Sequence, residues 1–267
     1  MARPHARKPL TDRAWFRALA LCALAAPCAT AAPYPAEETP ALIAAVLAHP
    51  LAASVPALLP AAKLALCACA LAPWVAARRG GRIVLGYYAT ILVIVGIFQN
   101  ISLATPYGFA WVAGNTAVQL LVAIACARDA GESPGRARPA HLDRRRLWLL
   151  APMALAFAMP YGFDATGAIV PTFDAGVFAN EAGVTYCMIT PVVVGTLVLF
   201  PGSAAPSTLS FASFVGLAFG IANLITWFGL DPASWWMGIL HLPLVVASAM
   251  GLFCARRMRA QGIATSR

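Results

Sequence analysis

Residues 83–127 read IVLGYYATILVIVGIFQNISLATPYGFAWVAGNTAVQLLVAIACA and contain no Asp, Glu, Lys or Arg. Arg82 and Arg128 bound this run. A bilayer core of about 30 Å is crossed by roughly 20 apolar residues of helix, so the run is long enough for two crossings. Its only proline, Pro106, lies near the middle among turn-forming residues. The run therefore predicts a helical hairpin that enters at Arg82, turns near Pro106 and leaves at Arg128.

The composition of the whole chain agrees with a protein embedded in lipid. Of the 267 residues, 61% are hydrophobic and 11% are charged. A soluble domain of this size could not cover its surface with so few charged residues, because about 25% is usual. The net charge of +9 does not indicate nucleic acid, since the basic residues form short runs between apolar blocks. We therefore expect an all-α, polytopic bundle with the lipid bilayer as its partner and no nucleic-acid partner.

The N-terminal residues 1–32 fit two interpretations. A basic head is followed by an apolar run and a tail of small residues, which is the pattern of a cleaved signal peptide. The same run, which is short for a crossing, also fits a first transmembrane helix that is retained. Both interpretations put residue 33 and those after it on the outer side. Residues 33–56 are then an outer segment, with an interfacial helix expected at about 41–49 or, alternatively, an irregular loop.

The remaining apolar blocks predict seven spanning helices within a membrane domain at residues 57–255, or eight with the N-terminal run. The predicted crossings are about 57–77, 83–103, 109–127, 147–163, 181–200, 209–229 and 235–254. Two polar segments are predicted at the inner side of the bundle, a connection at 128–146 and a C-terminal tail at 256–267.

The distribution of charge predicts the orientation of this bundle. Every Lys and Arg except Lys63 falls in a segment assigned to the inside. The segments assigned to the outside carry acidic residues and no basic ones. Basic residues accumulate on the cytoplasmic side of membrane proteins. We therefore expect a multi-pass protein of the plasma (inner) membrane with a cytoplasmic C-terminus.

A layer of polar residues in the outer half of the bundle is the candidate binding site. Lys63 lies roughly 9 Å below the predicted outer boundary, and polar residues of three other helices fall at a similar depth. A charge in hydrocarbon costs at least about 2.5 kcal/mol, so such residues face a partner or a wet cavity. We expect a pocket with Lys63 as its positive pole, which binds an anionic group or pairs with Glu181 or Asp164. The predicted binding residues are Lys63, Asn115, Gln119, Asn223, His241 and Glu181.

Each of these residues also has a purely structural interpretation. Lys63 could extend to the outer headgroups, and the asparagines could join neighbouring helices. His241 could be a neutral histidine bonded to a backbone carbonyl that Pro243 leaves without a donor, or a proton relay or haem ligand. The histidines of the chain show no metal-ligand spacing, so we expect no metal and no cofactor.

The sequence contains no motif that names a chemistry, whether a phosphate-binding loop, a dinucleotide fingerprint or a hydrolase or zinc-protease signature. Three classes of function remain. The first is a small-solute carrier or channel that uses the polar layer. The second is a membrane enzyme acting on a lipid at the outer face, with Asp164, Asp174, Glu181 and His241 as acid/base candidates. The third is a sensor or assembly partner, with a second subunit or copy. We favour the first and do not expect an enzyme.

Overall fold

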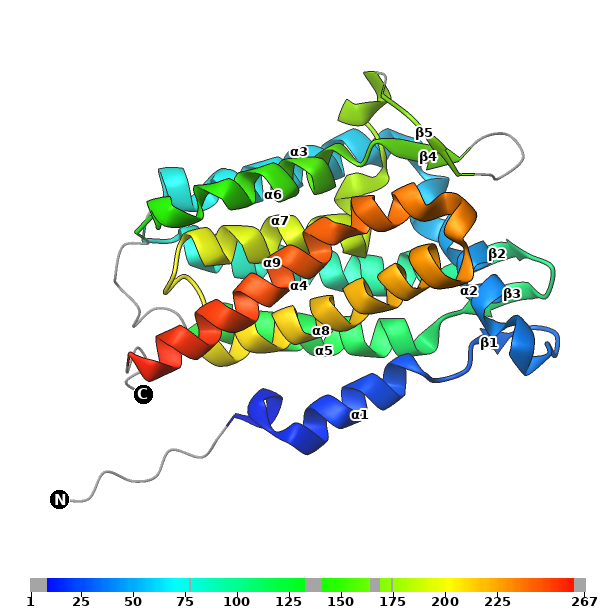
Figure 1. Cartoon of the computed structure of the whole chain (residues 1–267), viewed down its shortest axis with the longest axis horizontal. Helices are drawn as coiled ribbons and strands as arrows, with labels where there is room; N and C mark the ends of the chain where they lie inside the picture. The colour runs from blue at the N-terminus through cyan, green and yellow to red at the C-terminus, as the bar shows by residue number, and fades with distance from the viewer. Residues whose placement is uncertain (1–8, 77, 133–140, 164–168, 174, 262–267) are drawn as a thin grey trace.

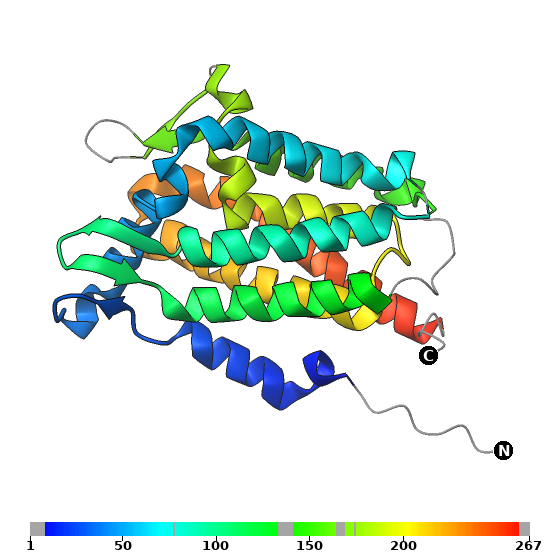
Figure 2. The ribbon, with the colours of Figure 1, turned by 180° about the vertical axis from the view of Figure 1, so that it is seen from behind.

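The computed structural model describes residues 9–76, 78–132, 141–163, 169–173 and 175–261. It is mostly helical (76%), as predicted. The long helices lie side by side along one axis, and the chain passes back and forth between two ends (Figures 1 and 2). All strands lie at one end, which we call the outer end, and α9 finishes at the other, which we call the inner end.

The helices follow the predicted order along the chain. They are α1 Ala14–Leu24, α2 Thr39–Ala48, α3 Leu59–Val75, α4 Gly80–Phe98, α5 Ala113–Glu132, α6 Leu150–Ala158, α7 Tyr186–Leu199, α8 Pro206–Ile225 and α9 Trp235–Ala260. A 3-10 segment, η6 (Arg144–Leu149), leads into α6, and a π-helical segment, η9 (Thr226–Leu230), continues α8. Each of the seven predicted crossings therefore overlaps one of the helices α3 to α9.

Four segments in the described part of the chain are long and apolar enough to cross a membrane. They are Pro56–Val75, Gly80–Phe98, Pro206–Leu230 and Pro232–Ala260. A fifth candidate is the pair Gly176–Val184 and Tyr186–Leu199, which is bent by 85°. These apolar helices indicate a membrane protein. The count of seven crossings stays a prediction, because α5 ends in charged residues and α6 is short.

The hairpin predicted at residues 83–127 has a β-structured joint. Helix α4 ends at Phe98 and α5 begins at Ala113, so the helix boundaries differ from the predicted 103 and 109. Strands β2 (Ile101–Thr105) and β3 (Gly108–Trp111) pair antiparallel between them, and Pro106 lies in the turn as predicted. A short β-structure is thus added to the predicted all-helical bundle at this point.

The turn of this hairpin is held by local and distant contacts. Thr105 Oγ1 donates to Gly108 O at 2.7 Å, and Gly108 has φ 72°, a conformation that glycine adopts without strain. The hydroxyl of Tyr107 donates to a carboxylate oxygen of Glu38. This hydrogen bond raises the pKa of Tyr107. The outer segment 33–56 is therefore tied to the hairpin, and α2 packs against it through Leu42 and Val46.

A second hairpin lies at the outer end of α6. Strand β4 (Tyr161–Phe163) pairs antiparallel with β5 (Ile169–Pro171). Helix α6 ends at Ala158, so the predicted crossing at 147–163 includes strand residues at its outer end. Met159 follows with φ 45°, the left-handed conformation that commonly ends a helix.

The N-terminal segment packs on the bundle. Phe16 and Ala20 of α1 belong to the main hydrophobic core, and the Phe16 ring lies 5.4 Å from that of Phe211 in α8. Strand β1 (Ala29–Thr30) pairs with β3 and completes a three-stranded sheet. A Cβ atom on Gly114 would collide with the carbonyl group of Ala23, so this glycine allows α1 to approach α5 closely. Residues 9–32 are therefore an integral part of this structure.

Candidate functional site

Lys63 on α3 is buried inside the protein, with 2% of the residue exposed. Its ammonium group donates to the carbonyl oxygen of Val177, to Asn180 Oδ1 at 2.6 Å and to Ala158 O at 3.5 Å. The ring of Phe157 lies 4.9 Å from Nζ. Three oxygens thus match the three N–H donors of the ammonium group. In this structure Lys63 is thus bonded within the protein.

Asn180 completes the contacts around Lys63. Its Nδ2 donates to Ala158 O at 2.7 Å and to Met159 O at 3.0 Å, and its Oδ1 accepts from Ala182 N at 3.2 Å. The last carbonyls of a helix have no partner within the helix, and a positive charge near them is favourable. Lys63 and Asn180 therefore cap α6 from two other segments of the chain.

The predicted pairing of Lys63 with an acidic residue is not seen in the described part of the chain. Glu181 makes no hydrogen bond or ion pair to Lys63 there. Asp164 and Asp174 lie outside the described residues. Asn180 was not among the predicted binding residues, because a loop amide carries no sequence signal of which distant helix end it will cap.

A pocket of about 600 Å³ lies next to this cap, at the outer end. Its polar lining residues are His49, Ser54, Tyr161 and Glu181. Apolar side chains, including Leu103 of β2, make up much of the rest. A mainly apolar cavity with a few polar groups is the usual form of a small-molecule site. Of the predicted binding residues, Glu181 lines this pocket.

Compared with known protein families, curated proteins and solved structures, the chain matches none of them. The site is therefore interpreted from its own geometry.

The polar groups of the pocket come from distant parts of the chain. His49 follows α2, and Glu181 begins the 3-10 segment η8 (Glu181–Val184). The two side chains are close enough to interact electrostatically. Tyr161 of β4 also lies within electrostatic range of Glu181. The pocket thus brings a carboxylate, an imidazole and a phenol together beside apolar walls.

The pocket lies beside a sharp break in the chain. The segment that ends at Val184 and helix α7 are bent by 85° relative to each other. Thr185 Oγ1 donates to Glu181 O at 2.9 Å, and Gln99 Oε1 accepts from the first N–H of α7, on Tyr186, at 3.0 Å. Gln99 thus satisfies one of the N–H groups that a helix start leaves without a partner.

The other predicted binding residues lie in separate contacts between helices. Gln119 of α5 accepts from Asn100 Nδ2 at 3.4 Å, while Asn115 lies half-buried on the same helix. Asn223 Nδ2 donates to Phe219 O at 2.9 Å and to Cys187 Sγ at 3.6 Å. The shared depth predicted from the sequence does not bring these side chains together with Lys63 in this structure.

His241 is buried and bonded within its own helix. Its Nδ1 lies 2.8 Å from Met237 O, which is not the carbonyl that Pro243 leaves without a donor. The ring of Trp227 lies 6.2 Å away. Within the described residues no group of three or more His, Cys, Asp or Glu could hold a metal ion. Of the acid/base candidates, Glu181 lines the outer pocket, whereas His241 bonds to its own helix.

Proposed function

We propose that the protein is a small-solute carrier of the plasma membrane, and that the outer pocket binds the solute with Glu181 as its charged contact. The observation that supports this is a pocket with a carboxylate at an 85° break in a candidate spanning segment. Broken helices form the substrate sites of many transporters. Irregular backbone at membrane depth is tolerated where it lines a cavity.

The solute that fits this pocket is a small organic cation with an apolar part. Glu181 is acidic, and the ammonium group of Lys63 is already bonded to three oxygens. Three of the other described acidic residues, Glu37, Glu38 and Asp231, belong to segments predicted to lie outside. An acidic surface raises the local concentration of cations. The Tyr161 ring and the apolar walls suit the uncharged part of the solute.

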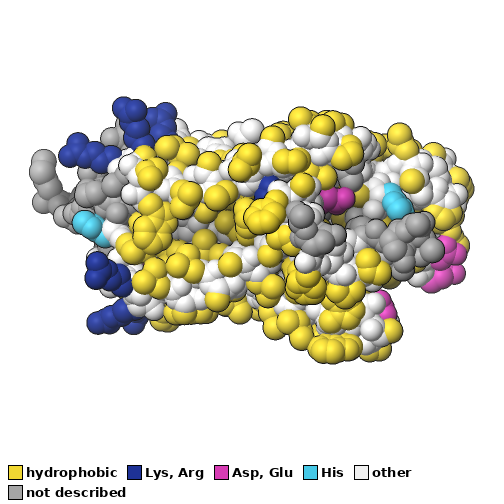
Figure 3. Space-filling view, turned by 90° about the horizontal axis from the view of Figure 1, so that it is seen from above, with side chains coloured by type: hydrophobic (Ala, Val, Ile, Leu, Met, Phe, Trp, Pro, Cys, Tyr) yellow, Lys and Arg dark blue, Asp and Glu magenta, His cyan; other side chains and the backbone are white. Residues whose placement is uncertain are grey.

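The distribution of charge supports an orientation with the pocket at the outer side of the membrane and the C-terminus in the cytoplasm. On the face shown in Figure 3, most of the visible Lys and Arg side chains gather at one end of the molecule, and the visible Asp and Glu side chains lie toward the other. We propose that helices α3 to α9 each cross the membrane, with the C-terminus in the cytoplasm. This arrangement follows the tendency of basic residues to remain inside.

Replacement of Glu181 by Gln is expected to weaken cation binding about tenfold, because losing about 1.4 kcal/mol of Coulomb attraction to the carboxylate raises the dissociation constant tenfold. The measurement is equilibrium binding of labelled phenyltrimethylammonium to the detergent-purified protein, with benzenesulfonate as the anion of similar shape. Glu132→Gln is the matched control, since Glu132 is exposed at the inner end of α5 and does not line the pocket. Equal binding of cation and anion would contradict the proposed solute class.

Uptake by proteoliposomes separates a carrier from a sensor. We expect vesicles with the wild-type protein to accumulate labelled phenyltrimethylammonium, and vesicles with Glu181→Gln to accumulate less. Binding without any uptake would favour the sensor and contradict the carrier.

We also propose that residues 9–32 are retained in the mature protein, because they form part of its core and of its outer sheet. The intact mass of the purified protein is expected to include them.

Asp12→Asn is expected to lower the free energy of unfolding by about 1 kcal/mol, because the Asp12 carboxylate pairs with Arg17 and Arg259. An unchanged thermal midpoint together with a mass lacking residues 1–32 would show that the segment is cleaved.

A further inference from the structure

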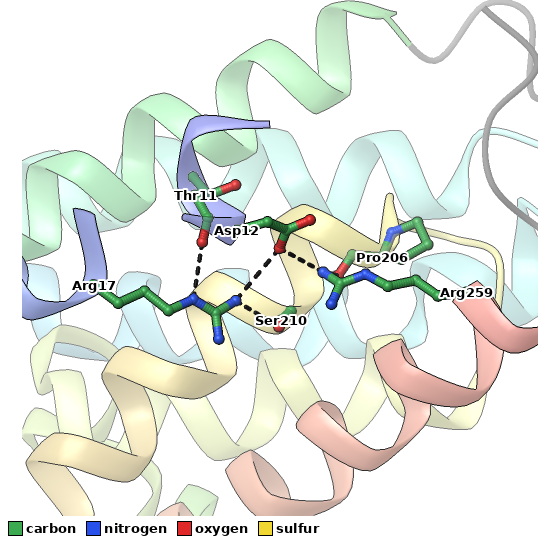
Figure 4. Close-up of polar contacts among 6 residues, drawn as sticks. All are labelled: Thr11, Asp12, Arg17, Pro206, Ser210 and Arg259. Atoms are coloured by element: carbon green, nitrogen blue, oxygen red, sulfur yellow. Dashed lines mark hydrogen bonds and ion pairs between the residues drawn. The ribbon is translucent and has the colours of Figure 1, made fainter. Parts of the chain in front are cut away.

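One carboxylate at the inner end joins arginines from the two ends of the described chain (Figure 4). Asp12 Oδ1 accepts from Arg17 Nη2 at 3.4 Å and from Arg259 Nη2 at 2.5 Å. Asp12 ends the short segment η1 (Leu10–Asp12), Arg17 belongs to α1, and Arg259 lies in the last turn of α9. Two guanidinium groups therefore share a single oxygen atom.

Further contacts hold the Arg17 guanidinium in position. Its Nε donates to Thr11 O at 2.9 Å, and its Nη2 donates to Ser210 Oγ of α8 at 2.8 Å. Its central carbon lies 5.2 Å from the ring centre of Phe214. The geometry of this group is therefore set by the protein itself. A ligand that binds here loses little free energy in ordering the side chain.

The cluster carries more positive than negative charge. Arg256, exposed on α9, is close enough to Arg17 for the two charges to repel each other, and so is Arg259. Arg17 and Arg259 thus pair with the carboxylate of Asp12, and Arg256 adds a third positive charge near Arg17. Among the described contacts, Arg17 uses Nε and Nη2, which leaves the N–H groups of Nη1 to donate.

Exposed apolar side chains continue from this cluster toward the middle of the bundle. On α1, Trp15 is 55% exposed and Leu19 is 57% exposed, and on α9, Phe253 is 48% exposed. Helix α1 lies at the edge of the bundle in both ribbon views (Figures 1 and 2). A molecule bound here would therefore meet guanidinium groups at one end and an apolar surface along its length.

We propose that Arg17, Arg256 and Arg259 form a site for the phosphate of an anionic phospholipid in the inner leaflet, with its acyl chains along α1 and α9. Guanidinium groups bind phosphate oxygens through paired, charge-assisted hydrogen bonds. The exposed apolar surface below the cluster favours a lipid over free phosphate. This inference does not depend on the proposed transport function. It does require residues 9–32 to be retained, which the intact mass reports separately.

The test is native mass spectrometry of the full chain, which counts bound phosphatidylglycerol and, for comparison, zwitterionic phosphatidylcholine. We expect retention of phosphatidylglycerol by the wild-type protein, and about fivefold weaker binding for Arg256→Gln, the usual effect of one basic residue near anionic lipid. Arg145→Gln is the matched control, because Arg145 is also exposed in a segment predicted to be cytoplasmic and is not part of the cluster. Equal losses in Arg256→Gln and Arg145→Gln, or no preference for phosphatidylglycerol, would overturn the proposal.

Two further experiments complete the test. The first distinguishes lipid binding by the cluster from a purely structural role, and the second distinguishes a lipid ligand from free phosphate. Asp12→Asn removes the carboxylate that pairs with Arg17 and Arg259, so we expect tighter lipid binding despite lower stability. A fall in both would overturn the proposal, because it would show that the cluster serves folding alone. Excess inorganic phosphate is expected to leave the lipid bound. Full displacement by phosphate would overturn the lipid as the ligand and show that the site takes the free anion.

Discussion

Replacing Lys63 with Met is expected to lower the free energy of unfolding by about 3 kcal/mol, because it takes the charged donor away from partly buried acceptors. The carbonyl of Val177 and the Oδ1 atom of Asn180 both accept from Nζ. Methionine is close in length to lysine and fills the same space with no donor. The measurement is the thermal midpoint of the detergent-purified protein, with Leu64→Met as control, since Leu64 is 71% exposed.

A gain in stability for Lys63→Met is also physically possible. Removing a buried charge recovers its desolvation cost, and buried ionic groups are sometimes replaced by apolar residues with a gain in stability. An unchanged or higher midpoint for Lys63→Met would show that desolvation outweighs the three contacts. The Asn180→Leu variant and the double variant complete a cycle. We expect a coupling of about 1–2 kcal/mol between residues 63 and 180, as is typical of side chains in direct contact.

Replacing Gly183 with Leu is expected to cost about 3 kcal/mol through overpacking. A Cβ atom at Gly183 would lie 2.6 Å from Ala62 C and 2.6 Å from Lys63 N. Both are backbone atoms of α3, so no side-chain rotation relieves the clash. Since Glu181 lies two residues earlier in η8, the variant is also expected to lose binding of phenyltrimethylammonium.

Gly86→Leu is the matched control for this variant. Gly86 lies within α4, and no atom of a neighbouring segment lies within 4 Å of a Cβ atom built there. Leucine favours helix over glycine by up to about 1 kcal/mol, so this change is expected to raise the thermal midpoint slightly. Similar midpoints for Gly183→Leu and wild type would contradict the close packing of η8 against α3.

The predicted binding layer shows that the depth of a residue along a helix does not determine which neighbours its side chain contacts. Residues at one depth on different helices can face different neighbours, since depth does not specify rotation about the helix axis. Asn223 contacts α7, Gln119 contacts Asn100, and His241 bonds its own helix. Glu181 lines the pocket together with His49, although the two are far apart in the sequence.

The sequence by itself determined the order of the apolar helices, the turn at Pro106 and the gathering of the basic residues at one end. These features depend on local composition and on the choice between lipid and water, and each is visible within one segment of about 20 residues. Only the tertiary structure decided that strands replace the outer helix ends, that Lys63 and Asn180 cap α6, and that α1 packs on the core. Those contacts join residues distant in the chain, and their free energy exists only once the segments have packed.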